Sequence, residues 1–266
     1  MIKMTVPFEN DTGNIVRKLA RKSLKSEKRR NLMVVIAVAL ASCLICFSIV
    51  MALSTRQIEK NHVEDTYEAV YTRITEEDVS TLKGLDDFSR VGEYYMLAVE
   101  PAEQGYNASY IYCDEETMYI ARDQMKLLEG RLPQKEDEVV VSRYFLSNYG
   151  SDAGIGEKVM LSSESFHGEY TVTGIMEGYK EKEVNGSSIL LSKEALKGWS
   201  GYDPADYRSY VHFKNEQQMD ETELTARSRE IAKEYQLEMP IMNLSYMKFY
   251  KQPVNVSMLA LVAGIA

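Results

Sequence analysis

The most regular feature of the chain is a long apolar segment near its start. Residues 32–53 read LMVVIAVALASCLICFSIVMAL, twenty-two residues without a charge. At about 1.5 Å per residue a helix of this length covers roughly 33 Å, enough to cross a hydrocarbon core of about 30 Å. Because a backbone inside a bilayer must satisfy its own hydrogen bonds, the pattern predicts a transmembrane helix over 32–53.

A cleaved signal peptide or a lipoprotein signal would fit this segment less well. A secretory signal peptide has an apolar core of about 7–15 residues, shorter than this one, and usually begins nearer the start. Leu40-Ala41-Ser42-Cys43 resembles a lipoprotein cleavage box, but ten more apolar residues follow Cys43. A mature lipoprotein would turn polar there, so a membrane-spanning helix remains the better interpretation.

A second periodic pattern precedes the apolar segment. Residues 14–25, NIVRKLARKSLK, predict an amphipathic helix that Asn14 can cap. Its apolar half contains Ile15, Val16, Leu19, Ala20, Ser23 and Leu24, and its basic half contains Arg17, Lys18, Arg21, Lys22 and Lys25. A helix of this kind lies on a membrane surface with its basic side toward anionic lipid. The alternative is a solvated helix that packs on a protein partner.

The charges around the apolar segment predict its orientation. Residues 1–31 carry nine Lys and Arg against three Asp and Glu, and Arg29 and Arg30 stand directly before the segment. Because cationic flanks stay on the cytoplasmic side, we expect residues 1–31 to form a cytoplasmic leader and the chain from residue 54 to lie outside. The seven membrane-interface residues that we predict are Arg17, Lys18, Arg21, Lys22, Lys25, Arg29 and Arg30.

Beyond residue 54 the pattern alternates between strand-like and helix-like segments. A first β-α-β unit is predicted from strands at 67–74 and 91–99 and a helix through Leu82, opened by a capping box of Thr75 and Asp78. A second unit is predicted from a strand at 207–213, a helix at 220–235 and a strand near 239–244.

The part between these two units is rich in short strands. Strands are expected at 109–113, 118–120, 138–141, 158–161, 170–175 and 187–191, and short helices at 142–148 and 193–196. From Val254 the chain is apolar again; its last thirteen residues, 254–266, are too few to span and are expected to be the start of a truncated second transmembrane helix.

Charge and composition exclude several classes of function. Residues 54–266 carry 22 Lys and Arg against 37 Asp and Glu, a net charge of −15, so nucleic-acid binding is disfavoured outside the leader. Cys113 is the one thiol outside the apolar segment, which leaves the outer domain without a disulfide. The three histidines are scattered, and no phosphate loop, nucleophile elbow or metal spacing occurs. We therefore expect no catalytic residues, no metal and no cofactor.

The order of these parts resembles that of MacB/FtsX/LolC-type (type VII) ABC transporter permeases. The similarity rests on the basic KLARKSLKSEKRRN segment before one span, and on EGRLPQKEDEVVVSRYFLSNYG, IGEKVML and YTVTGIM. The residues that match the pattern of that family's outer domain are Gly130, Arg131, Pro133, Glu138, Val140, Ser142, Gly156, Lys158, Val159, Val172, Thr173, Gly174 and Ile175. These residues mark turns and strands rather than chemistry.

The resemblance implies an α+β ectodomain on a transmembrane α-helix, with the amphipathic helix before it. An extracytoplasmic domain over 54–253 would combine porter-like β-α-β units at 60–125 and 203–250 with a β-rich insertion at 126–202. The family further implies a non-catalytic permease subunit in a bacterial cell membrane, multi-pass when complete. Its partners would be a cytoplasmic ABC ATPase, a second permease copy in a homo- or heterodimer, the lipid bilayer, and an extracytoplasmic peptide or protein.

Several functions remain open at this point. Relatives export or extract antimicrobial peptides, antibiotics or lipoproteins, and FtsX-like members regulate cell-wall hydrolases. A two-span membrane sensor would produce the same hydropathy pattern. A membrane-tethered extracellular enzyme is disfavoured by the absence of a catalytic constellation.

Overall fold

The computed structural model describes residues 12–101, 107–149, 152–178 and 181–251, and it divides the chain into two compact units. The first comprises Met1–Gln57 with Val254–Ala266, and the second is Ile58–Pro253. The expected second membrane helix at 254–266 lies outside the described residues.

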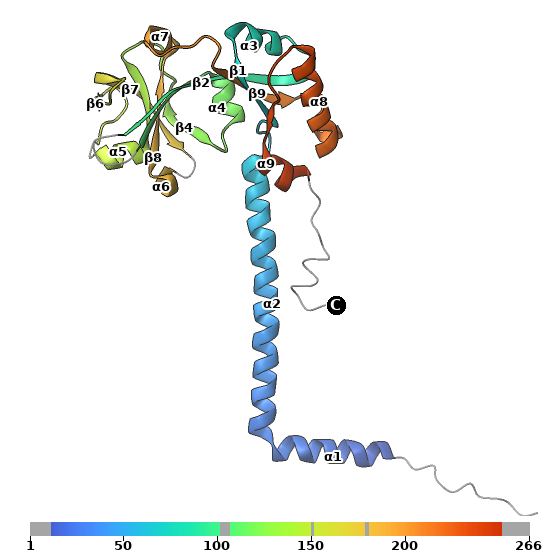
Figure 1. The fold of residues 1–266 in the computed structure, drawn as a ribbon. Helices are drawn as coiled ribbons and strands as arrows, with labels where there is room; N and C mark the ends of the chain where they lie inside the picture. The colour runs from blue at the N-terminus through green and yellow to red at the C-terminus, as the bar shows by residue number, and fades with distance from the viewer. Residues whose placement is uncertain (1–11, 102–106, 150–151, 179–180, 252–266) are drawn as a thin grey trace, which may run out of the picture. The chain divides into compact units, whose positions relative to one another are not determined.

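Two helices make up the described part of the first unit (Figure 1). Helix α1 is Thr12–Ser26, and after Glu27 helix α2 runs from Lys28 to Val63, with its last residues in the second unit. By length and composition α2 can cross a membrane, and its apolar window is not buried. Because α2 has 36 residues, about 54 Å of helix, it extends beyond the predicted span at both ends.

A split β-α-β arrangement forms one half of the second unit. Its elements are β1 (Ala69–Ile74), α3 (Glu76–Lys83), β2 (Phe88–Pro101), β9 (Tyr207–Phe213), α8 (Glu221–Glu234) and β10 (Ile241–Met242). The strands lie in the order β10-β1-β9-β2, with β9 antiparallel to both of its neighbours. This is the ferredoxin-like order, in which each β-α-β crossover spans one intervening strand. The sequence-predicted β-α-β units are therefore present.

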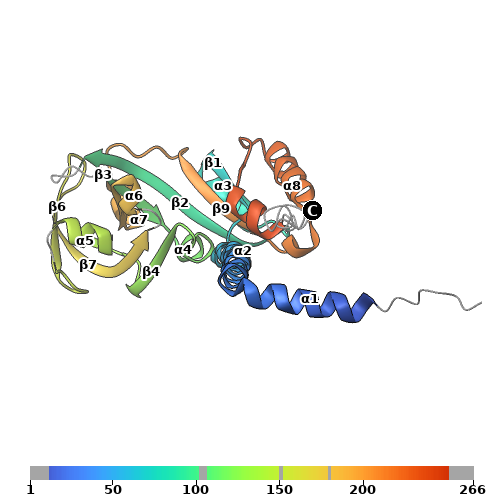
Figure 2. The ribbon, with the colours of Figure 1, turned by 90° about the horizontal axis from the view of Figure 1, so that it is seen from below.

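A β-rich segment enters this arrangement between β2 and β9. Its elements are β3 (Asn107–Cys113), α4 (Glu115–Ile120), β4 (Met125–Gly130), β5 (Glu138–Ser142), α5 (Arg143–Tyr149), β6 (Lys158–Ser162), β7 (His167–Gly178), α6 (Glu181–Val184), β8 (Gly186–Leu191) and α7 (Lys193–Gly198). The long strand β2 joins the two parts, because its first half pairs with β9 and its second half with β3 (Figure 2). One continuous sheet therefore runs through the unit, in the order β10-β1-β9-β2-β3-β8-β5-β7-β4.

Alternating side chains place a hydrophobic cluster on each face of this sheet. In β5, Val139 and Val141 belong to one cluster and Val140 to the other. The first cluster includes α3 and α8 residues such as Leu82 and Ile231, whereas the second includes Ile120 of α4. The α+β class predicted from the sequence is thus the observed one.

The structure corrects three local predictions. Residues 118–120 belong to α4 and not to a strand, because Asp114 is the N-cap of that helix and its side chain accepts a hydrogen bond from Thr117 N. The last strand has only two residues, since Asn243 caps the short helix α9 (Leu244–Tyr246), which η2 (Met247–Lys251) follows. Asn14 lies inside α1 and does not cap it.

Candidate functional site

The basic residues predicted from the sequence all lie on the two helices of the first unit. Those at positions 17, 18, 21, 22 and 25 are exposed on α1, and Arg29 and Arg30 are in the first turn of α2. Arg30 forms an ion pair with Glu27. The apolar side chains Ile15, Val16 and Leu19 of α1 are also exposed, by 59–63%. Helix α1 therefore presents an uncovered apolar face together with its basic face.

The family-motif residues build one tight turn between β4 and β5. Arg131 donates to both carboxylate oxygens of Glu138, at 2.8 and 2.7 Å. Glu138 also accepts from the backbone N–H of Gln134 at 2.9 Å, so it holds both ends of the turn that contains Pro133. The Arg131 hydrogen bonds lower the pKa of Glu138 to about 2.

The motif glycines and Ser142 have equally local roles. A Cβ on Gly130, at φ +84°, would lie 2.2 Å from the carbonyl oxygen of Thr173, and Gly130 pairs with Gly174 across β4 and β7. Gly156 has a φ of +86° but open space around it. The Ser142 hydroxyl accepts from Phe145 N at the start of α5. These motif residues therefore set local backbone geometry, and Gly130 and Arg131 also line a cavity of about 430 Å³.

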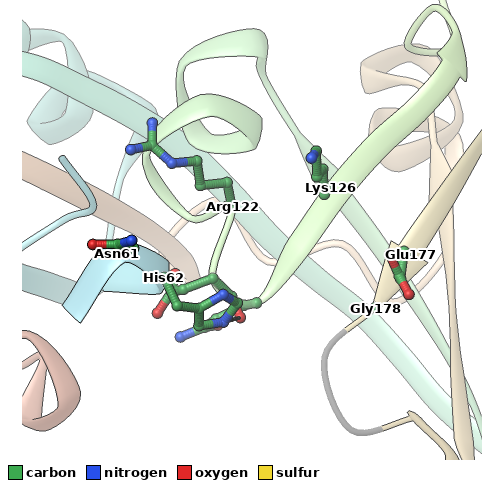
Figure 3. A pocket seen from close by; sticks show the side chains of 8 residues that line it. Asn61, His62, Arg122, Lys126, Glu177 and Gly178 are labelled. Carbon is green, nitrogen blue, oxygen red and sulfur yellow. Dashed lines mark hydrogen bonds between the residues drawn. The ribbon is translucent and has the colours of Figure 1, made fainter. Parts of the chain in front are cut away.

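A polar cavity of about 530 Å³ lies within the second unit beside the last turn of α2 (Figure 3). Its lining comprises Asn61, His62, Arg122, Asp123, Gln124, Lys126, Glu177 and Gly178. Figure 3 shows Asn61 and His62 approaching from α2, Arg122 and Lys126 from the α4–β4 segment, and Glu177 from β7. His62 Nε2 is 3.1 Å from the backbone oxygen of Asp123.

A second cavity, of about 460 Å³, shares His62, Asp123 and Gln124 with the first. Its lining is more apolar and includes Tyr67, Tyr94, Met96, Ile111, Met125 and Met242. Asp123 is 8% exposed, and burial raises the pKa of its carboxyl group to about 6, an effect that the nearby His62 partly offsets. The residues around Asp123 therefore form the most distinctive chemical environment among the described residues.

Sequence reasoning missed these cavity residues. His62 reads as a scattered histidine, and Asp123 lies in a segment between a wrongly predicted strand and β4. The tyrosines come from the residues just before β1 and from β2, far apart in the sequence. The sequence offers one signal for these tyrosines: along a strand they alternate with core residues of the opposite face of the sheet, as Tyr94 does with Tyr95.

A buried polar cluster holds the beginning and the end of the second unit together. Glu68 lies 2.7 Å from His212 Nδ1 and accepts from Phe213 N at 2.8 Å. Glu216 accepts from the hydroxyl of Tyr246 and forms an ion pair with Lys251 at 2.8 Å. Burial raises the pKa of Glu68, although its hydrogen bond to His212 opposes this. We assign these groups a structural role.

The described residues contain no group of three or more His, Cys, Asp or Glu side chains arranged to hold a metal. Cys43 and Cys46 lie in α2, and Cys113 is buried in β3, where burial raises the pKa of its thiol. A buried thiol of raised pKa is a poor nucleophile.

No curated protein matches the chain significantly. Among solved structures, the extracellular domain of the noncanonic ABC-type transporter YknZ from Gram-positive bacteria is 15% identical, with 67% of this chain and 100% of that chain covered and a TM-score of 0.47. The periplasmic region of MacB from Actinobacillus actinomycetemcomitans is 10% identical, with coverages of 70% and 91% and a TM-score of 0.49.

The family comparison carries the assignment. The MacB-like periplasmic core domain matches residues 32–229, a range that includes both the apolar segment of α2 and most of the second unit. The chain therefore belongs to the family of the MacB-like periplasmic core domain, the ectodomain of MacB/FtsX-type ABC transporter permeases.

Proposed function

We propose that this chain is part of a permease subunit whose ectodomain is moved by ATP hydrolysis on a separate cytoplasmic ATPase. The single observation that supports this best is the family match over 32–229, because this one match covers both the apolar segment of α2 and most of the ectodomain. Helix α2 supports the proposal because it is continuous from Lys28 to Val63, and Val63 is buried in the core. A helix anchored in this way can transmit a shift to the domain.

The topology that we propose has three parts. Residues 1–31 form a cytoplasmic leader, 32–53 the membrane-spanning segment and 54–253 the extracytoplasmic domain. Within that domain we propose that 60–125 and 203–250 act as the porter-like part and 126–202 as the insertion. The exposed apolar and basic faces of α1 support its placement on the inner membrane surface.

The substrate of such a permease would be the molecule that the moving ectodomain contacts. Export or extraction of a peptide, an antibiotic or a lipoprotein, and control of a cell-wall hydrolase, all use the same coupling. We propose coupling by paired subunits, because an ATPase of this kind closes as a dimer and would act on two permease copies. A two-span sensor is the competing function, and it requires no ATPase.

The test is to purify the complete protein from its native membrane and identify what accompanies it. We expect a nucleotide-binding subunit. For distance measurements, Cys43 and Cys46 are changed to Ala, and spin labels are attached to Glu77→Cys in α3 and Met160→Cys in β6. The distances between labels on the paired ectodomains should change when ATP is added. An ATPase variant that binds but does not hydrolyse ATP should trap one distance. A fully active protein without any ATPase would replace this proposal by the sensor.

A further inference from the structure

A buried carboxylate lies where the two cavities of the second unit meet. Asp123 lines both cavities, and its Oδ1 atom makes no hydrogen bond to any residue that the structure describes. An unpaired buried oxygen carries a desolvation cost that a bound donor would remove. The raised pKa of Asp123, about 6, has the same origin. The Asn243 side chain, His62 and Arg122 lower the pKa of this carboxyl group, but its Oδ1 atom has no hydrogen-bond donor among the described residues.

The wall of the smaller cavity is aromatic and sulfur-rich. Tyr67 and Tyr94 line it, and the ring of Tyr210 lies edge-on to both, with centroid distances of 4.7 and 5.6 Å. Aromatic faces carry negative potential and attract cations, and methionine thioethers adapt to varied apolar shapes. The Arg208 guanidinium already lies 5.7 Å from the centroid of Tyr94, so this ring accepts a cation within the fold itself.

Carboxylates predominate among the charged side chains of the smaller cavity. Glu59 and Asp123 contribute them, His62 is a basic side chain on the same lining, and the described lining residues include no Lys or Arg. Arg122 and Lys126 belong to the larger cavity, and Arg122 is engaged with Asp65 at 3.6 Å. A buried acid beside tyrosine and methionine side chains is complementary to an organic cation.

We propose that the smaller cavity binds a primary ammonium group carried on a short apolar stem. The ammonium would donate to the carboxylate of Asp123, and the stem would pack against Tyr67 and Met96. This site is independent of the proposed transport function, since it rests on the second unit alone. Because His62 and Val63 of the last α2 turn line the cavity, the bound molecule would contact the end of that helix.

The test is a titration of the full chain in nanodiscs with n-pentylammonium chloride, followed by calorimetry, with n-pentanol as the uncharged match. For a ligand of this size we expect a Kd in about the millimolar range. Asp123→Asn should weaken binding at least about tenfold, the amount of one lost charge-assisted hydrogen bond. The fold should tolerate this variant because a neutral amide replaces a buried acid. The matched control is Asp86→Asn, a fully exposed acid that lines neither cavity and pairs with Lys214, and this variant should bind as wild type does.

The pH dependence supplies a second readout. At pH 5, one unit below the pKa of about 6, roughly a tenth of the Asp123 carboxylates would be ionised, so binding should weaken about tenfold relative to pH 7.5. The ionisable groups that act on Asp123 are His62, Arg122, Tyr67 and Tyr210, and the Asn243 side chain and the backbone of Asp123 also lower the pKa of its carboxyl group. Because His62 is itself ionisable, the His62→Gln variant separates the two, and it should keep the pH dependence.

Four results would each overturn the proposal. The first is n-pentanol binding as tightly as n-pentylammonium, which would leave only an apolar cavity. The second is binding to Asp123→Asn within twofold of wild type, and the third is a pH dependence that disappears in His62→Gln. The fourth is saturable binding of Na⁺ or K⁺ that competes fully with n-pentylammonium, which would make this an inorganic cation site.

Discussion

At the residue scale, the ectodomain depends on charged side chains that close short turns. Glu138 is buried in β5, yet its carboxylate receives two hydrogen bonds from Arg131 and others from the backbone of residues 134 and 135. Such charge-assisted bonds are stronger than neutral ones. The motif residues Arg131 and Glu138, which the sequence marks as part of a turn, thus form a clamp on the β4–β5 turn.

We predict that Glu138→Gln lowers the free energy of unfolding by about 1–3 kcal/mol, because the ion pair with Arg131 is lost and the backbone N–H groups of residues 134 and 135 lose a charged acceptor. The pKa of Glu138, about 2, lies below the ordinary value of 4.5. Its stabilisation is therefore complete above pH of about 4.5 and is lost as the pH falls toward 2. Denaturant melts from pH 5 to 2 should fall more steeply for wild type than for Glu138→Gln; parallel curves would contradict the clamp.

Two glycine variants separate the energetic cost of a steric collision from the cost of backbone strain. Gly130 and Gly156 have nearly equal φ angles, but a Cβ would collide with backbone only at Gly130. Gly156→Ala should cost about 1 kcal/mol from strain alone. Gly130→Ala should cost clearly more, about 3 kcal/mol or loss of folding, because β4 and β7 must separate. Thermal unfolding measures both, and equal costs would show that the contact with Thr173 is relieved easily.

At the element scale, the segment that ends the second unit is held to its first residues by long-range contacts. Asn243 N donates to the Glu68 carbonyl oxygen, and Asn243 Nδ2 donates to that of Tyr67. Lys60 in the last turns of α2 lies 4.9 Å from the ring centroid of Tyr250. The point where the chain enters this unit and the point where it leaves are therefore packed against each other.

The Glu216–Lys251 ion pair allows this junction to be tested. The side chains of Lys251 and Glu216 are only 8% and 6% exposed, so Lys251→Met should leave Glu216 as an unpaired buried charge and cost about 3 kcal/mol. Lys248→Met, an exposed lysine three residues earlier, is the control and should change stability by less than about 0.5 kcal/mol. Hydrogen exchange in 244–251 should rise in Lys251→Met and recover when Glu216→Gln is added. Unchanged exchange would assign the packing to Tyr246 and Met247 alone.

For helix α1, which has exposed basic and apolar side chains, we proposed the inner membrane surface as the partner. Its basic side chains are exposed, and the periodicity of its apolar residues does not depend on them, so charge reversal should leave the helix intact. Changing Lys18, Arg21, Lys22 and Lys25 to Glu should abolish binding of an α1 peptide to anionic vesicles, since each basic residue near such a surface contributes about 1 kcal/mol. Neutral vesicles are the control. Undiminished binding to anionic vesicles would favour a protein partner for this helix.

At the scale of the whole molecule, charge asymmetry predicts how the chain lies across a membrane. Residues 1–31 are basic, and 54–266 carry a net charge of −15. A phosphatase reporter fused after residue 253 should be active only outside the cytoplasm. Reversing the leader charge at Arg29 and Arg30 should reduce that activity. A reporter that is active in the cytoplasm would contradict the proposed topology and the coupling that depends on it.

The sequence alone determined those features that arise from neighbouring residues. The apolar run of α2, the amphipathic pattern of α1 and the capping box of Thr75 and Asp78 are all local, because helix formation and capping depend on residues within about four positions. The alternating strands and the two β-α-β units follow from the same short-range periodicity. The family resemblance added the motif positions, and the sequence match over 32–229 confirmed the family.

Tertiary structure decided what depends on residues far apart in the chain. Residues 118–120 resemble a strand locally but form part of α4, whose start is held to β2 because Asp114 accepts from Glu93 N and the Thr117 hydroxyl donates to the carbonyl oxygen of Glu93. Similarly, the unpaired oxygen of Asp123 has significance only because β2, the residues just before β1 and the last turn of α2 surround it. The order of strands in the sheet brings these residues together, and periodicity along a chain carries no information about that order.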